Sequence, residues 1–144
     1  MVSYISGLMR IAAAACLLLG LAAPAGAQEK AISLELNKAA DSEAGCRLTF
    51  VVKNDTQSLL EKTSYELAVF DSEKTVLKLF SFDFGRLPKG KTKVVEFALA
   101  EIKCAGISRI LVNTSPACTA DGAASTICLD ALKTSSLIKI VFDQ

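Results

Sequence analysis

The sequence has no histidine and no tryptophan, and its two methionines, Met1 and Met9, both lie near the N-terminus. Without histidine there is no Ser-His-Asp or Cys-His nucleophilic site, no imidazole metal ligand and no side chain that ordinarily titrates near neutral pH. Without further methionines, thioether copper sites are excluded as well. We therefore expect neither a cofactor nor an enzyme.

An excess of positive charge is also missing. The chain carries 16 Lys and Arg and 15 Asp and Glu, and without Arg10, which lies in the N-terminal segment, both totals are 15. Proteins that bind nucleic acid or an anionic membrane normally need a basic excess. The balance argues against either as the main partner.

The first 27 residues have the organisation of a secretory signal peptide. Arg10 precedes an apolar run, residues 11–21, and small residues follow at 22–27 before the chain becomes polar. An uncleaved anchoring helix, the alternative, needs about 20 apolar residues, and this run is shorter. We predict cleavage after Ala27, which leaves one periplasmic or secreted domain, residues 28–144, without a membrane segment.

Five cysteines are present, of which Cys16 lies in the signal peptide and Cys46, Cys104, Cys118 and Cys128 remain in the domain. An even number of cysteines in a small exported domain is typical of disulfides. The alternatives are a zinc site or a redox-active dithiol. The separations of 58, 14 and 10 residues provide neither the close pairs of zinc sites nor a C-x-x-C motif.

Three pairings of these four cysteines are possible, and the positions of the expected strands favour one. Cys46 and Cys104 each stand just before a strand, and in a Greek-key sandwich these two strands run in the same direction, so their starts share one end. Cys118 and Cys128 lie in one connection. We predict the bridges Cys46–Cys104 and Cys118–Cys128, which contribute about 4 and roughly 3 kcal/mol in the chain-entropy treatment.

Alternation of apolar and other residues predicts seven short strands, separated by turn-forming sequences such as Leu87-Pro88-Lys89-Gly90. Seven strands in about 110 residues are typical of an immunoglobulin-like two-sheet sandwich, and a small β-barrel is the alternative. The strands are expected at residues 32–37, 48–54, 65–70, 75–82, 94–99, 107–113 and 137–142.

The expected strand at 75–82 is apolar on both faces. Phe80 and Phe82 alternate on one face, and Leu77 and Leu79 lie on the other. Such a pattern is typical of a strand that is buried on both sides, or of one that bends, here near Ser81. We expect the phenylalanines from Phe80 to Phe97 in the core rather than on a binding surface, because the domain has few other aromatic residues.

The connection from Thr114 to Ser136 is long for a compact domain, at 23 residues. Connections of this length are usually functional or disordered. Its own cysteine pair argues against disorder, and residues 127–134 favour a helical turn. Two interpretations stay open: a binding loop, or a loop that the bridge merely pins to the end of the sandwich.

Charged residues provide weaker candidates. Asp71, Asp83 and Glu66 can be imagined as a hydrolytic carboxylate pair, but acids at turns and on exposed faces are ordinarily solvated. Arg109 has apolar neighbours in the sequence that would partly cover it, so it is expected to pair with an acid such as Glu66. A basic cluster surrounds the turn at Pro88-Lys89-Gly90 and consists of Arg86, Lys89, Lys91 and Lys93. We expect it to be the solvated tip of a hairpin; the alternative is a binding site for an anionic polymer.

Two resemblances add to these expectations. The segment from Leu48 through Leu67-Ala68-Val69-Phe70-Asp71 to Gly90 resembles the FxLYD type of immunoglobulin-like domain over roughly 50 residues. Over most of the domain, the chain resembles a group of short exported bacterial proteins of uncharacterised function. That resemblance rests on Gly45-Cys46-Arg47-Leu48, Phe82-Asp83-Phe84, residues 109–113 and the remaining cysteines, and it implies a periplasmic location and two disulfides.

The function expected from these features is a non-enzymatic interaction module that presents loops or a sheet edge to another protein of the cell envelope. The alternative is a ligand-binding or inhibitor protein that uses residues 114–136. A small envelope hydrolase is the third hypothesis.

Overall fold

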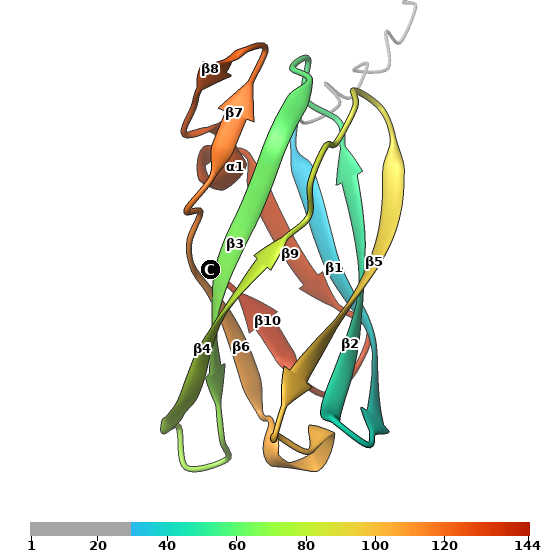
Figure 1. Ribbon diagram of the computed structural model, residues 1–144, viewed down its shortest axis with the longest axis vertical. Helices are drawn as coiled ribbons and strands as arrows, with labels where there is room; N and C mark the ends of the chain where they lie inside the picture. The colour runs from blue at the N-terminus through green and yellow to red at the C-terminus, as the bar shows by residue number, and fades with distance from the viewer. Residues whose placement is uncertain (1–29) are drawn as a thin grey trace, which may run out of the picture.

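The computed structural model describes residues 30–144, so the predicted signal peptide, residues 1–27, lies outside the described part of the chain. Ten strands form two sheets that face each other and do not close into a barrel (Figure 1). The predicted all-β sandwich is therefore confirmed, and the barrel alternative is wrong. The strands number ten rather than seven, because short strands form in segments that lack a clear alternation.

The first sheet has four strands in the order β5-β2-β1-β9. A hairpin of β1 and β2 forms its centre, and β9 lies parallel to β1, so the last third of the chain pairs with its first strand. Antiparallel β5 forms the other edge. The bounds are Ile32–Ser42 for β1, Gly45–Asn54 for β2, Thr92–Ala100 for β5 and Leu132–Ser136 for β9.

The second sheet is built around β3, which pairs with β4 on one side and with β6 and then β7 along the other. β10 lies parallel to β6, and β8 completes a small hairpin with β7. The bounds are Leu60–Phe70 for β3, Val76–Asp83 for β4, Arg109–Thr114 for β6, Cys118–Ala120 for β7, Ala123–Ala124 for β8 and Val141–Asp143 for β10.

The core lies between the sheets and contains the residues that the alternation places inward. Ile32, Leu34 and Leu36 on β1 are completely buried, as are the alternate residues of β2 and β3. An aromatic cluster spans the two layers, because Phe84 packs edge-on against Phe50 at 5.8 Å and against Tyr65 at 5.5 Å between ring centroids. The inward faces of β1, β2 and β3 are therefore as predicted.

The Cys46–Cys104 bridge is confirmed. It joins the start of β2 to a short 3₁₀ helix, η1 (Cys104–Gly106), which leads into β6. Cys46 is fully buried, and the two Cα atoms are 4.8 Å apart across 58 residues of sequence. The bridge links the two sheets at the lower end of Figure 1.

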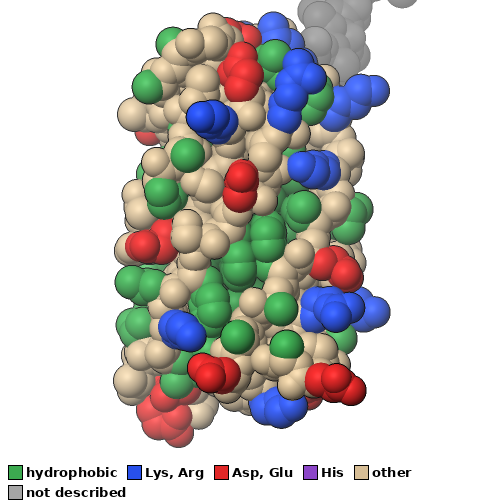
Figure 2. Space-filling model, in the orientation of Figure 1, with side chains coloured by type: hydrophobic (Ala, Val, Ile, Leu, Met, Phe, Trp, Pro, Cys, Tyr) green, Lys and Arg blue, Asp and Glu red, His purple; other side chains and the backbone are tan. Residues whose placement is uncertain are grey.

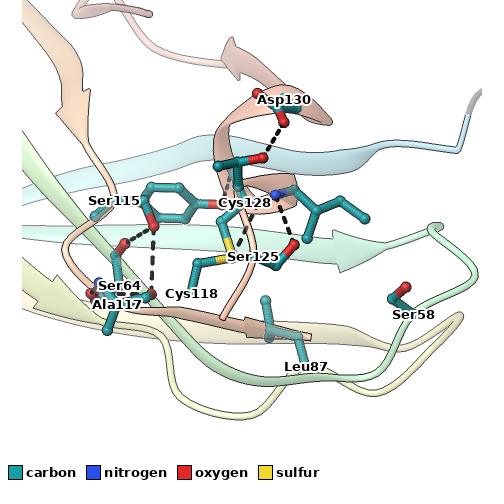
Figure 3. The surroundings of a disulfide bond; sticks show 12 residues. Ser58, Ser64, Leu87, Ser115, Ala117, Cys118, Ser125, Cys128 and Asp130 are labelled. Atoms are coloured by element: carbon teal, nitrogen blue, oxygen red, sulfur yellow. Dashed lines mark hydrogen bonds between the residues drawn. A yellow bond between two sulfur atoms is a disulfide. The ribbon is translucent and has the colours of Figure 1, made fainter. Parts of the chain in front are cut away.

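The Cys118–Cys128 bridge is also confirmed and ties β7 to α1 (Ile127–Asp130), as Figure 3 shows. The hydroxyl of Tyr65 on β3 donates a hydrogen bond of 2.8 Å to the backbone carbonyl of Cys128. Burial raises the pKa of the Tyr65 phenol well above its usual range. The bridge and this hydrogen bond together hold α1 against the second sheet.

Two expectations about the C-terminal third are wrong. The segment 114–136 is not one connection, because it contains β7, β8 and all of β9, although its expected helical turn is confirmed by α1. The turn between β7 and β8 is Asp121-Gly122, with positive φ at both residues. A strand at 137–142 does not form. Residues 137–140 instead carry the chain from β9 in the first sheet to β10 in the second, which a continuous strand cannot do.

Asn54 organises the upper end of the sandwich. Its fully buried amide donates hydrogen bonds to the carbonyls of Ser58, at 2.9 Å, and Leu87, at 2.8 Å, and its side-chain oxygen accepts from the backbone N–H of Thr56. The β2–β3 and β4–β5 connections are thereby fixed to each other. This positions the chain that follows β4.

The two bridges should differ in their effect on stability. Replacing Cys46 and Cys104 by Ala is expected to cost about 4 kcal/mol, against roughly 3 kcal/mol for Cys118 and Cys128, because the first bridge closes the longer loop. Urea unfolding of the two double variants measures the difference. An equal or reversed order would contradict the chain-entropy explanation.

Tyr65→Phe should lower the free energy of unfolding at pH 7 by about 1 kcal/mol, because the Cys128 carbonyl loses its donor. The folded pKa of Tyr65 lies above the unfolded value near 10, so the wild type keeps its full stability below pH 10 and loses stability as the pH rises further. The variant lacks this loss. In urea unfolding, the free energy of unfolding of the wild type should exceed that of the variant by less at pH 11 than at pH 7. An equal difference at both pH values would contradict the raised pKa of Tyr65.

Candidate interaction site

Strand β4 has a free edge. Among residues 30–144 it pairs only with β3, and no strand pairs with its other side. Both faces are apolar, as predicted. Of the two interpretations of this pattern, burial on both sides is wrong, because Val76, Leu77 and Leu79 are 50%, 43% and 50% exposed. The sequence of β4 is therefore typical of a central strand, although the strand lies at a sheet edge.

The inner face of β4 borders the open seam between the two sheets, opposite β5. Phe82 stacks on Phe97 of β5, with ring centroids 4.2 Å apart and an interplanar angle of 13°, and Phe80 stacks on Phe82 at 5.9 Å. Phe80 and Phe97 are only half-buried. Figure 2 shows hydrophobic side chains gathered along the middle of this face. The expectation that these phenylalanines lie in the core is confirmed for Phe82 and Phe84, which are 8% and 0% exposed, whereas Phe80 and Phe97 are only partly buried and pack against the edge of the core.

Side chains, rather than backbone hydrogen bonds, cross the seam. Lys93 on β5 donates a hydrogen bond of 2.6 Å to the carbonyl of Phe84, just beyond β4. Near the start of β4, the Lys78 ammonium lies 3.9 Å from a carboxylate oxygen of Glu101 and 5.3 Å from the centre of the Phe80 ring. The backbone edge of β4 is thus left without a strand, and Lys78 is its one lysine.

The outer face of the second sheet continues the apolar surface of β4. Leu79 lies beside Ala68 on β3, which in turn lies beside Leu111 on β6. Below this row, a pocket of about 500 Å³ opens on the same sheet. Its lining residues are Phe70, Ser72, Lys74, Ser108, Arg109 and Val141.

Arg109 in this pocket pairs with an acid, as predicted, but the acid is Asp143 and not Glu66. Its guanidinium binds the carboxylate of Asp143 on β10 at 3.0 Å and lies 5.2 Å from the Phe70 ring. Glu66 instead accepts a hydrogen bond of 2.6 Å from the amide of Asn113. The parallel pairing of β6 and β10, which sequence reasoning missed, brings Asp143 close to Arg109.

The carboxylates considered for hydrolysis each accept a local hydrogen bond. Asp71 accepts from the Thr75 N–H at 2.8 Å and closes the β3–β4 turn, and Asp83 accepts from the Gly85 N–H at 2.7 Å. Asp83 and Glu66 are diagonal neighbours on β4 and β3, whereas Asp71 lies at the opposite end of β4. Among the described residues, no group of three or more metal-binding side chains occurs.

The basic cluster lies at the upper end of the sandwich. Arg86, Lys89 and Lys91 are exposed, whereas Lys93 is half-buried because it reaches the carbonyl of Phe84. Lys and Arg side chains gather at the upper right of Figure 2. A polar pocket of about 340 Å³ lies at this end, lined by Lys30, Asp55, Thr56, Gln57, Lys89 and Gly90.

The hairpin of β7 and β8 packs against the β2–β3 connection. The Asp121 carboxylate accepts a hydrogen bond of 2.9 Å from the Leu59 N–H, which lowers the pKa of Asp121. Gly122 donates to the carboxylate of Glu61 at 3.0 Å. Residues 114–136 are therefore largely ordered by their own contacts, as a pinned connection would be.

Comparison with protein-family models, curated proteins and solved structures finds no match to the chain. The two resemblances noted from the sequence remain predictions. No helix within residues 30–144 is both long and apolar enough to cross a membrane.

Leu79→Lys should leave the fold intact, because half of this side chain already contacts solvent. We expect a loss of less than about 1 kcal/mol in urea unfolding. Leu67→Ala, on the completely buried face of the adjacent strand, should cost about 2–5 kcal/mol and serves as the comparison. A loss of that size for Leu79→Lys would place Leu79 in the core and not in a surface site.

Proposed function

We propose that this protein is a non-enzymatic interaction module of the cell envelope that binds an extended segment of another protein along the free edge of β4. The partner segment adds to the second sheet as a further strand. Backbone hydrogen bonds supply general affinity, and side chains at alternate positions supply specificity. The proposal includes export to the periplasm, which the disulfides support because they persist in oxidising compartments.

The observation that carries this proposal is the composition of the β4 edge. Natural edge strands are usually short, charged or interrupted, because an exposed apolar edge readily pairs with other chains. β4 is eight residues long, exposes Leu77 and Leu79 on its surface and has half-buried Phe80 on the seam. A strand placed beside it would cover apolar side chains on both faces at once.

The same geometry indicates the chemistry of the partner segment. Its residues facing the seam would meet Phe80, so they should be apolar, and those on the outer face would meet Leu79. Beyond the end of β4 lies Arg86, in the exposed basic cluster. A carboxylate at the matching end of the segment is therefore favoured.

Residues 114–136 support a binding role less well. Their hairpin and helix are held by the Cys118–Cys128 bridge and by contacts of Asp121 and Gly122, which use the polar groups that a ligand would need. The free edge of β4 has no such internal partner among the described residues.

Affinity capture from an extract of the native compartment, with cross-linking before extraction, tests the proposal. The wild type and Val94→Lys should capture the same partner, whereas Leu79→Lys should capture at least tenfold less. Val94 is the matched control because it is 62% exposed on β5, in the other sheet. Equal capture by all three proteins would show that the partner binds away from β4, and capture of none would contradict the interaction function.

A further inference from the structure

We infer that the edge of β4, when no partner segment occupies it, pairs with β4 of a second copy of this chain. This inference rests on the proposed function, since both use the same free edge. Two identical edges that are related by a two-fold axis pair as antiparallel strands. If residue i of one copy lies opposite residue j of the other, residue j of the first copy also lies opposite residue i of the second. The chain must therefore be complementary to itself in one antiparallel register.

An axis through Leu79 provides this register. It places Leu79 of one copy opposite Leu79 of the other on the outer face, and Lys78 opposite Phe80 on the seam face. Lys78 already lies 5.3 Å from its own Phe80 ring, and its pairing with Glu101 at 3.9 Å joins two largely solvated groups. Such a surface pair is weak, so the ammonium can move to the ring of the second copy.

The neighbouring register fits less well. An axis through Phe80 would place half-exposed Leu79 opposite the hydroxyl of Ser81. It would also place Lys78 opposite Phe82, which is 8% exposed and stacked on Phe97. This axis would place the two Phe80 rings opposite each other, but Leu79 and Lys78 would gain no apolar or aromatic contact, and Leu77 would lie opposite the carboxylate of Asp83. The axis through Leu79 is therefore favoured.

Charge complementarity supports the antiparallel arrangement. The turn before β4 carries Asp71 and Glu73 against one lysine, Lys74, and Arg86 follows β4 in the basic cluster. These two groups lie at opposite ends of the sandwich (Figure 1). In the register centred on Leu79, the acidic turn of one copy lies beside Arg86 of the other, on both sides of the axis.

Pairing through one strand buries a small area, so the dimer should be weak, with Kd on the order of 10–100 µM. A dimer of this affinity dissociates readily, so the second copy covers the edge of β4 reversibly. The dimer protects the apolar edge from irreversible association, and a tighter-binding partner segment displaces the second copy. Partner binding and self-association should therefore compete.

Sedimentation velocity of the signal-free chain, residues 28–144, from 1 to 300 µM tests the inference. The wild type and Val94→Lys should change from monomer to dimer across this range, and Leu79→Lys should remain monomeric. A wild type that is monomeric throughout, or a dimer that Leu79→Lys leaves unchanged, would overturn the inference. Neither result affects the proposed function, which is tested by the capture experiment.

A cysteine variant tests the register. Under mild oxidation, Leu79→Cys should give a disulfide-linked dimer, because the two substituted positions would face each other across the axis. Ser81→Cys, two residues along the same exposed strand, should link at least tenfold less and is the matched control. Preferential linkage through position 81 would overturn the assigned register, and so would linkage through neither position.

Discussion

The fold depends on burying the inward faces of β1, β2 and β3 between two sheets. Their side chains are fully removed from water at alternate positions, from Ile32 on β1 to Val69 on β3. A domain of this size buries only a modest apolar area, so cross-links contribute noticeably to its stability. The Cys46–Cys104 bridge lies in this layer and secures it at one end. The seam between β4 and β5 closes less completely than the rest.

That incomplete closure explains why β4 differs from the other edge strands. β9 and β10 are joined through the bend at 137–140. β5 is also an edge strand and carries two charged residues, as β4 does, but it exposes one large apolar side chain, Val94, against three on β4. β4 combines two apolar faces with a free backbone edge. The Phe82–Phe97 stack separates the core from the exposed part of the seam, so a strand can add beside β4 without opening the core.

The alternation of residues along the chain correctly predicted the strands whose inward faces depend only on that alternation. The alternation in β1, β2 and β3 identified their inward faces, and the spacing of the cysteines, together with the strands, identified both bridges. The edge position of β4 was not predicted, because burial of a doubly apolar strand depends on the order of strands in the sheet. The β7–β8 hairpin was missed although Asp121-Gly122 is a strong hairpin signal, because the flanking residues, mostly alanines, do not alternate. Residues 137–142 alternate well, but 137–140 cross between the sheets and only 141–142 belong to a strand, β10.

The parallel pairing of β1 with β9 has a consequence for biosynthesis. A chain is made from its N-terminus, yet β1 gains its second neighbour only when residues 132–136 appear, and β10 adds to the other sheet only with residues 141–143. Neither sheet can therefore be complete before these residues have been synthesised. Until then, one backbone edge of β1 stays unpaired, so the first strand of the domain waits longest for its full set of neighbours.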